Sequence, residues 1–214
     1  MKHTVNMETW ERRDNFRFFE NFLNPCISFT SEVRCTGARN EARKKGKSFF
    51  LHYLYAILKA VNEIRELRFR IEASGQVVWF DTVDVMVPLK MNASGKFYTV
   101  RIPWHPDFPT FYAEAFRAVA AVPADGDPYA ATHAAVGDDR YNVVLVSVIP
   151  DLFFTSITYT QQHAHGNDYP LMNVGKAIER NGEWIMPIAL SVDHSFVDGA
   201  HIADFYKRVE TYLN

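Results

Sequence analysis

A long apolar run that ends in a polar turn and leads into a final helix constrains this chain more than any other stretch. Residues 185–192 (IMPIALSV) have the length and the Ile, Leu and Val content of a buried strand. His194 follows this strand, and after Asp198 and Gly199 the apolar residues recur at helical spacing up to Leu213. A histidine at the end of a buried strand is held on one side and open to a ligand on the other. His194 is therefore the first candidate for a functional residue.

The composition is that of a globular protein, with 48% hydrophobic and 22% charged residues among 214. This length predicts a single domain over residues 1–214. The net charge of −2 creates no basic field, so we expect no nucleic-acid partner, and we interpret the basic cluster at 39–47 as a solvated turn or the start of a helix. Cys26 and Cys35 show neither a disulfide framework nor metal spacing. With no membrane-spanning run and no recognised secretion signal, we expect a cytoplasmic protein that contacts no membrane.

Hydrophobic periodicity predicts more strands than helices. The predicted helices are residues 9–20, 49–66, 108–122 and the C-terminal segment, and the predicted strands are residues 26–36, 68–72, 76–80, 97–103, 142–149, 153–159 and 185–192. Residues 123–137 and 161–170 are predicted loops. Strands that follow one another directly favour an α+β fold, a two-layer sandwich with helices packed on one face of a mixed sheet.

Short motifs spread over the chain share their order and spacing with one known family. They are WERR (10–13), FRFF (16–19), ELR (66–68), VW (78–79), VD (83–84), SVIP (147–150), FTS (154–156), GK (175–176) and HSFVDG (194–199). The last motif alone is weak, because three fixed positions recur by chance. As a set, over nearly the whole chain, they resemble the chloramphenicol acetyltransferases. The resemblance implies an acyltransferase that moves the acetyl group of acetyl-CoA directly to a hydroxyl of chloramphenicol or a similar small molecule.

The resemblance also assigns catalytic roles. Acetyl transfer needs a base for the attacking hydroxyl and a donor for the oxyanion. An imidazole suits the first role because it titrates near neutral pH, and the resemblance gives it to His194. Ser147 matches the oxyanion donor rather than a nucleophile. Asp198 is implied to pair with Arg12 and orient the turn, while Gly199 should supply backbone freedom there.

Substrate contacts are expected mainly from aromatic side chains, which make up 14% of the chain. Phe18, Phe19, Phe29 and Phe97 could be core residues, but the resemblance places such positions in the acceptor pocket. Lys176 matches a lysine near the coenzyme A channel. The resemblance further implies a homotrimer with active sites between subunits and no permanently bound cofactor. His163 and His165 could form a metal pair with His194, but no carboxylate or cysteine completes a site, so we expect a solvated loop and no metal.

Several positions depart from the family pattern. Asp193 replaces the first histidine of the usual pair, Asn15 replaces another histidine, and Phe19 lacks the tyrosine hydroxyl that meets the antibiotic. Asn173 replaces a threonine, and Asp151 replaces an aromatic residue. The acceptor therefore stays open: another alcohol or thiol is one alternative, and a non-catalytic trimeric binding protein is a second. A dihydrolipoamide acyltransferase is disfavoured because no lipoyl domain or flexible linker is present.

Overall fold

The computed structural model describes residues 1–160 and 169–214. Its helices are α1 (Arg13–Phe19), α2 (Thr36–Lys45), α3 (Phe49–Glu63), α4 (Phe108–Ala120), α5 (Ala130–Ala134) and α6 (Gly199–Leu213), with 3-10 turns η1 (Arg65–Arg68) and η2 (Gly137–Arg140). Its strands are β1 (Lys2–Thr4), β2 (Cys26–Arg34), β3 (Phe69–Ile71), β4 (Val77–Phe80), β5 (Asp84–Lys90), β6 (Phe97–Ile102), β7 (Val143–Val148), β8 (Leu171–Val174), β9 (Ile178–Arg180) and β10 (Glu183–Asp193).

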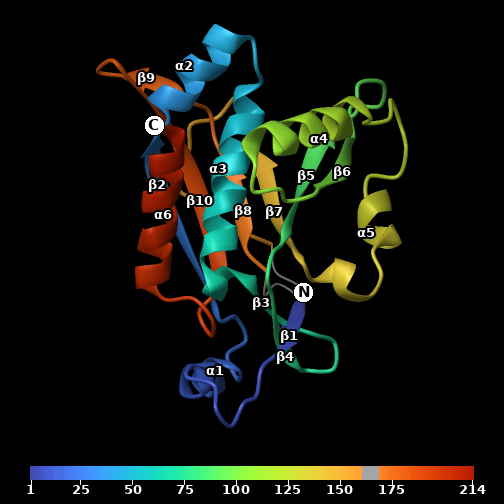
Figure 1. Ribbon diagram of the computed structural model, residues 1–214, viewed down its shortest axis with the longest axis vertical. Helices are drawn as coiled ribbons and strands as arrows, with labels where there is room; N and C mark the ends of the chain where they lie inside the picture. The colour runs from blue at the N-terminus through green and yellow to red at the C-terminus, as the bar shows by residue number, and fades with distance from the viewer. Residues whose placement is uncertain (161–168) are drawn as a thin grey trace.

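Within these residues the strands form one large mixed sheet and one small sheet. The large sheet has the order β2-β10-β8-β7-β5-β6, with β9 paired to the start of β10, and the small sheet has the order β1-β4-β3. Strand β7 runs parallel to β5 and β8, whereas β10 runs antiparallel to β8 and β2. Helices α3, α4 and α6 cover one face of the large sheet (Figure 1). The predicted two-layer α+β fold is therefore confirmed.

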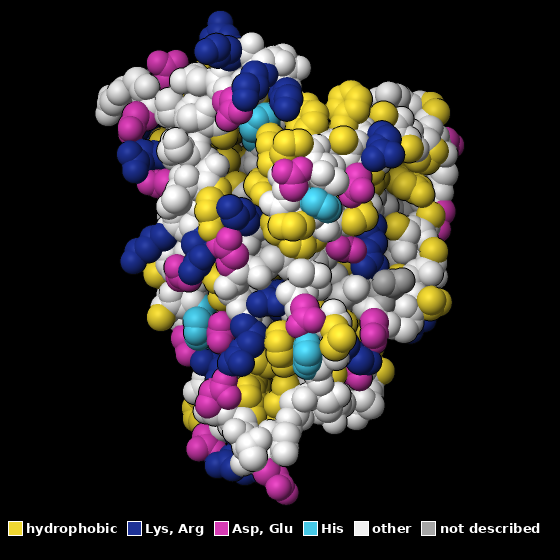
Figure 2. Space-filling model, in the orientation of Figure 1, with side chains coloured by type: hydrophobic (Ala, Val, Ile, Leu, Met, Phe, Trp, Pro, Cys, Tyr) yellow, Lys and Arg dark blue, Asp and Glu magenta, His cyan; other side chains and the backbone are white. Residues whose placement is uncertain are grey.

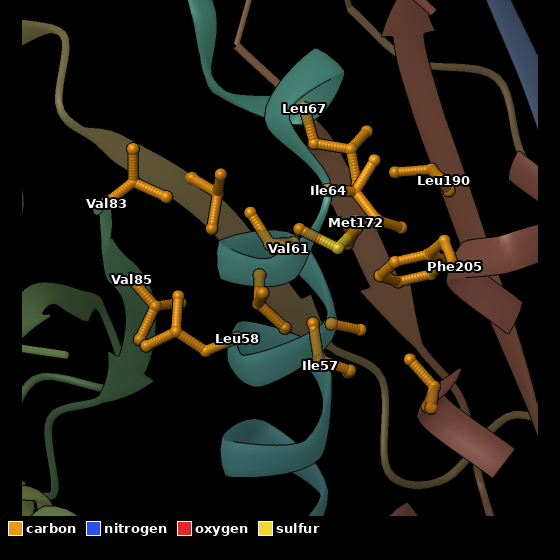
Figure 3. Close-up of a cluster of buried hydrophobic side chains, with 14 of the residues drawn as sticks. Ile57, Leu58, Val61, Ile64, Leu67, Val83, Val85, Met172, Leu190 and Phe205 are labelled. Carbon is orange, nitrogen blue, oxygen red and sulfur yellow. The ribbon is translucent and has the colours of Figure 1, made fainter. Parts of the chain in front are cut away.

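Helix α3 lies at the centre of the core. Nine of its residues are buried, so it contacts neighbours on nearly all sides instead of along one stripe. Figure 3 shows Ile57, Leu58 and Val61 of this helix packed between the sheet residues Val85 and Leu190, with further apolar side chains around them. This packing fixes the positions of β5, β8 and β10 relative to the helices.

The residues of each strand alternate between the helix-covered face and the opposite face, which we call the far face. Val144 and Val146 of β7 are fully buried in the helix-facing core, so Ser147 points to the far face. Ser147 pairs with Asn173, which in turn pairs with Ala189. Paired residues in adjacent strands point to the same side, so all three lie on the far face.

The small sheet is connected to β7 by a buried arginine. Arg70 of β3 is fully buried, and its guanidinium donates to main-chain carbonyls, including those of Leu67 and Phe69 before it and Tyr141 and Val143 at the start of β7. In a dry environment these bonds satisfy the buried guanidinium, which would be costly to leave without acceptors. Arg70 therefore fixes where β7 enters the large sheet.

Most predicted elements are confirmed, with some corrections. Helix α1 is shorter than predicted, α3 ends at Glu63, and α2, β1, β5, β8 and β9 were not predicted as elements. Residues 153–159 are not a strand, because β5 and β8 already occupy both sides of β7. Helix α5 and η2 interrupt the expected loop after α4. Most of the predicted loop 161–170 lies outside the described residues.

The surface carries charges of both signs. On the face that Figure 2 shows, Lys and Arg side chains alternate with Asp and Glu, and yellow apolar side chains gather over α4. No helix in the described part of the chain has the length and apolarity needed to cross a bilayer.

Candidate active site

The turn after β10 is held by several main-chain hydrogen bonds. His194 N donates to Pro25 O at 2.9 Å, and Val197 N donates to Asp193 O at 3.0 Å. The Asp193 carboxylate accepts a bond from Ser195 N at 2.7 Å. Asp193 is itself buried, and its burial raises the pKa of this carboxyl above the usual range. These bonds give His194 a fixed position at the end of the strand.

Phe196 anchors the same turn in an aromatic cluster. Its ring is buried and lies 5.5 Å from the ring of Phe69, 5.8 Å from that of Phe16 and 6.2 Å from that of Trp10. Aromatic rings at such separations pack favourably in tilted or offset arrangements. The N-terminal segment that contains Trp10 and Phe16 therefore supports the turn from below.

The geometry of His194 determines which of its nitrogens can act as a base. Nδ1 lies 2.9 Å from Val197 O, and because a carbonyl can only accept, Nδ1 carries the proton. Nε2 is then the unprotonated nitrogen. The side chain is 32% exposed and the ring of Phe19 stacks on it at 4.6 Å, with Phe18 packed edge-on against Phe19. The ring is thus covered on one face by Phe19 and remains partly exposed.

Asp198 contacts Arg12 rather than completing a triad. The two side chains share a bidentate pair at 2.7 and 3.0 Å, as the resemblance implied, and Asn15 Nδ2 lies 3.4 Å from the same carboxylate. The Arg12 guanidinium lowers the pKa of the Asp198 carboxyl. His194 Nδ1 is 3.7 Å from Asp198 Oδ1, farther than its bond to the main chain. Asp198 therefore orients the turn and makes no direct hydrogen bond to His194.

Gly199 differs from the expectation that it supplies backbone freedom. It is the first residue of α6 and is absent from the residues with positive φ, and a Cβ atom there would meet nothing within 4 Å. The reversal of the chain is instead made by the turn before it. Neither conformation nor space requires glycine at this position.

Ser147 occupies a different part of the sheet. Its side chain is partly exposed on the far face, and no described residue forms a hydrogen bond with its hydroxyl. Asn173 is its neighbour in β8 and is mostly buried. Phe97, half exposed, lies on the same face, whereas Phe29 pairs with a helix-facing residue of β10 and points to the other face. Of these aromatic candidates, only Phe97 shares a face with Ser147.

Lys176 follows a glycine that packs too closely for any side chain. A Cβ atom on Gly175 would lie 2.5 Å from Pro187 Cγ and 2.8 Å from Leu152 O. Lys176 N donates to Leu152 O at 2.8 Å, so this segment runs beside the loop that contains Asp151. Lys176 itself is exposed. A cation in this position is free to meet an anionic ligand.

The register of the sheet separates Ser147 from His194 within one chain. Ser147 is level with Ala189 across β8, and β10 continues from there to Asp193. That distance along β10 is roughly 13 Å, and the two strand spacings add about 10 Å across the sheet. At right angles these two components place Asp193 about 16 Å from Ser147, and His194 is one residue further, so the structure does not bring His194 and Ser147 together within one chain.

One residue near the site was not recognised as part of it in the sequence. His201 contacts the main chain of Asp198 and lies 3.9 Å from Glu66. The spacing of Asp198 and His201 is that of a capping box, which is the signal that could have identified it. No cluster of potential metal ligands occurs in the described ranges. His163 and His165 lie outside the described residues.

Comparisons with known proteins agree on one family. A family model described as "Chloramphenicol acetyltransferase" matches residues 1–210. Chloramphenicol acetyltransferase 3 of Escherichia coli is 25% identical, with 98% of this chain and 95% of that protein aligned. A chloramphenicol acetyltransferase of Clostridium perfringens is 23% identical, over 96% of this chain and 92% of that protein.

Solved structures give the same result. A chloramphenicol acetyltransferase is 54% identical and superimposes with a TM-score of 0.96 over the whole of both chains. Azotobacter vinelandii dihydrolipoamide acetyltransferase is 18% identical with a TM-score of 0.60, over 94% of this chain and 85% of that one. This second likeness shows a common fold only.

Proposed function

The chain belongs to the chloramphenicol acetyltransferase family and is an acyltransferase, and we propose that it transfers the acetyl group of acetyl-CoA to a hydroxyl of chloramphenicol or a similar small molecule. The observation that carries this proposal is the state of His194. Its Nδ1–H is fixed on Val197 O, which leaves Nε2 as an accessible base at the end of a rigid strand. We further propose that residues 1–214 act as one domain.

The proposed reaction is a single direct transfer. Nε2 of His194 takes the proton of the acceptor hydroxyl while its oxygen forms a bond to the thioester carbonyl carbon, and the carbonyl electron pair moves to oxygen. When this tetrahedral intermediate collapses, the carbon–sulfur bond breaks and the proton passes from the imidazolium to the leaving thiolate. The products are the acetyl ester and free coenzyme A. No acyl-enzyme forms, and acetyl-CoA is a co-substrate rather than a bound cofactor.

Ser147 is proposed to donate its hydroxyl proton to the oxyanion of that intermediate. The hydroxyl has no competing partner in the described chain, and the strand holds it between β5 and β8. A preorganised donor of this kind stabilises the developing charge without first having to reorient. The adjoining Asn173 is proposed to lie at the edge of the same pocket.

The separation of about 16 Å between Ser147 and the end of β10 next to His194, estimated from strand geometry, supports an active site shared by two copies of the chain. In this arrangement His194 of one copy faces Ser147 of its neighbour. We propose a homotrimer, the assembly that the family resemblance implies, because in a closed ring of identical contacts each copy completes the site of its neighbour.

The substrates are proposed to approach along the far face and the His194 turn. Phe18, Phe19 and Phe97 would contact the acceptor, and Phe29 is left out because it points to the other face. Lys176 would meet a phosphate of coenzyme A. Because acetyl-CoA is available in the cytoplasm, we propose that the protein works there and confers resistance to the antibiotic.

A second acceptor is favoured by one observation. Phe19 stacks directly on the base but has no hydroxyl to offer a hydrogen bond. A site built to bond a substrate hydroxyl discriminates strongly, and one without that bond discriminates less. Another small alcohol or thiol is therefore the alternative substrate class.

Steady-state release of coenzyme A thiol from acetyl-CoA in the presence of chloramphenicol tests the proposal. We expect turnover by the wild type and a loss of roughly 10²–10⁴ in kcat for His194→Ala. His105→Ala, which changes a partly exposed histidine before α4, should remain as active as the wild type. Turnover with other alcohols or thiols only would replace the acceptor. Binding of acetyl-CoA without any turnover would favour a non-catalytic binding protein.

A further inference from the structure

A second histidine, His201, forms a hydrogen bond with the turn that carries His194. His201 lies in the first turn of α6, and Asp198 N donates to its Nδ1 at 3.0 Å. Because a main-chain N–H can only donate, Nδ1 of His201 must be unprotonated, and its proton is on Nε2. Nε2 lies 3.9 Å from Glu66 Oε2 of η1, which favours that assignment. His201 therefore has the opposite tautomer to His194.

The two histidines bind the same peptide group from its two sides. The carbonyl of Val197 accepts from His194 Nδ1, and the N–H of Asp198, in the same planar unit, donates to His201 Nδ1. A peptide whose N–H is bonded becomes a stronger acceptor at its oxygen, because hydrogen bonds in a chain polarise one another. The bond to His201 therefore strengthens the bond that keeps the proton on Nδ1 of His194 and leaves Nε2 free.

We propose that His201 is a positioning residue for acetyl transfer, which acts on His194 through the peptide group between Val197 and Asp198 and must be neutral to do so. This inference rests on the function proposed above. Glu or Gln ordinarily makes this contact at the third position of a helix, and neither changes charge near neutral pH. Imidazoles do change charge between about pH 5 and 8. The start of α6 is therefore capped by a side chain that can make this contact only in its neutral form.

Protonation of His201 removes the contact. A protonated Nδ1 would place one N–H against another, so the ring must turn away. The charged groups around it are Glu66 and, beyond it, Arg65 on η1, the Asp198 carboxylate at the helix start, and Arg12. A cationic ring would move toward the carboxylates and compete with Arg12 for Asp198. The peptide group between Val197 and Asp198 would then hold the Nδ1 proton of His194 less strongly.

The dependence of kcat/KM on pH tests this role, because His201→Gln keeps an acceptor that does not titrate. If both imidazoles must be neutral, the acid limb of log kcat/KM falls for the wild type with a slope about one greater than for His201→Gln. At pH 8 the Gln variant should lie within about threefold of the wild type, whereas His201→Ala should fall about 10-fold because the peptide is no longer fixed.

His105→Gln is the matched control. His105 Nδ1 also accepts a main-chain N–H, from Asp107 at the start of α4, but on a different helix. This variant should keep the wild-type slope. An unchanged slope in His201→Gln, or an unchanged kcat/KM at pH 8 in His201→Ala, would overturn the inference, and if His194→Ala is inactive in the same assay the proposed function still stands.

Imidazole ¹⁵N spectra provide a readout that does not need turnover. The Nδ1–H form of His194 should dominate in the wild type and in His201→Gln and decrease in His201→Ala. If the wild type has no activity, the proposed function fails and the catalytic part of the inference fails with it, while these spectra still decide whether His201 fixes the proton of His194. Identical His194 spectra in all three proteins would reject it.

Discussion

The two ends of the large sheet that carry the proposed site are held in different ways. The turn at His194 depends on side chains from elsewhere in the chain, above all Arg12 and His201, which meet at Asp198. The strand end at Ser147 depends on the main-chain ladders to β5 and β8. One end is thus fixed by a few polar side chains and the other by the sheet itself.

This difference teaches where the site is vulnerable. Substitutions around the turn should change stability, geometry and pH dependence together, because the same contacts carry all three. Substitutions at the strand end should change the rate alone, because the ladders remain when one side chain is altered. Variants at the two ends can therefore separate catalysis from support.

The largest difference should come from Ser147→Ala. Removing one oxyanion donor is expected to lower kcat by roughly 10²–10³ while the thermal midpoint stays the same. Steady-state kinetics and a thermal melt measure the two quantities. Ser191→Ala is the control, since this buried serine of β10 bonds Ser28 instead of a substrate. If Ser147→Ala lowers the thermal midpoint as well as kcat, the strand end also depends on side chains.

Arg12→Ala should lower both the catalytic rate and the stability, because Arg12 supports the turn. The Arg12 side chain is only 13% exposed but that of Asp198 is 41% exposed, so solvent screening limits the expected destabilisation to about 1–2 kcal/mol. Arg13→Ala, at an exposed arginine next in the chain, should cost much less. Denaturant unfolding of the three proteins checks this. Equal destabilisation by both variants would mean that the pair with Asp198 does not support the turn.

The loss of stability in Arg12→Ala should depend on pH, because it follows the pKa of Asp198. Arg12 lowers that pKa in the folded chain, so the stabilisation is present above the ordinary aspartate pKa and is lost as the pH falls through the lower folded value. The difference in the free energy of unfolding between the wild type and Arg12→Ala should therefore shrink in acid. A constant difference down to the lowest accessible pH would contradict this.

The smallest effect should come from Asp193→Asn, and this variant should gain stability where Arg12→Ala loses it. Burial raises the pKa of Asp193, so the folded chain is penalised as the pH rises from the ordinary aspartate value through the raised one, and the penalty persists above it. Asparagine still accepts from Ser195 N but carries no charge. We expect the variant to be slightly more stable at neutral pH and equal in acid, as measured by denaturant unfolding at both pH values. A loss of stability at neutral pH would show that the charge is needed.

The sequence identified the turn more fully than the sheet. His194, Asp198 and Arg12 could be named because their motifs stand in fixed order, and the structure joins the last two directly. Strand β5 was not predicted because its segment contains Pro88 and shows little alternation of apolar and polar residues. Residues 153–159 read as a strand because local pattern carries no information on whether a partner strand is free.

Longer-range relations were beyond the sequence for a physical reason. The spacing of Asp198 and His201 can indicate a capping box, but it does not show that the same peptide group also bonds His194. The distance between Ser147 and His194 depends on the register of three strands, which is set by packing of whole faces. Motif spacing along the chain gives neither the shared peptide group nor the distance across the sheet.

The separation of Ser147 from His194 has a genetic consequence. In the proposed trimer each site draws its base from one copy and its serine from the next, so damage to the two residues falls on different halves of the site. A chain that lacks the serine and a chain that lacks the base could together assemble some sites with both groups intact. Two inactive alleles could then complement each other in one cell, whereas a single allele that carries both lesions could not rescue itself.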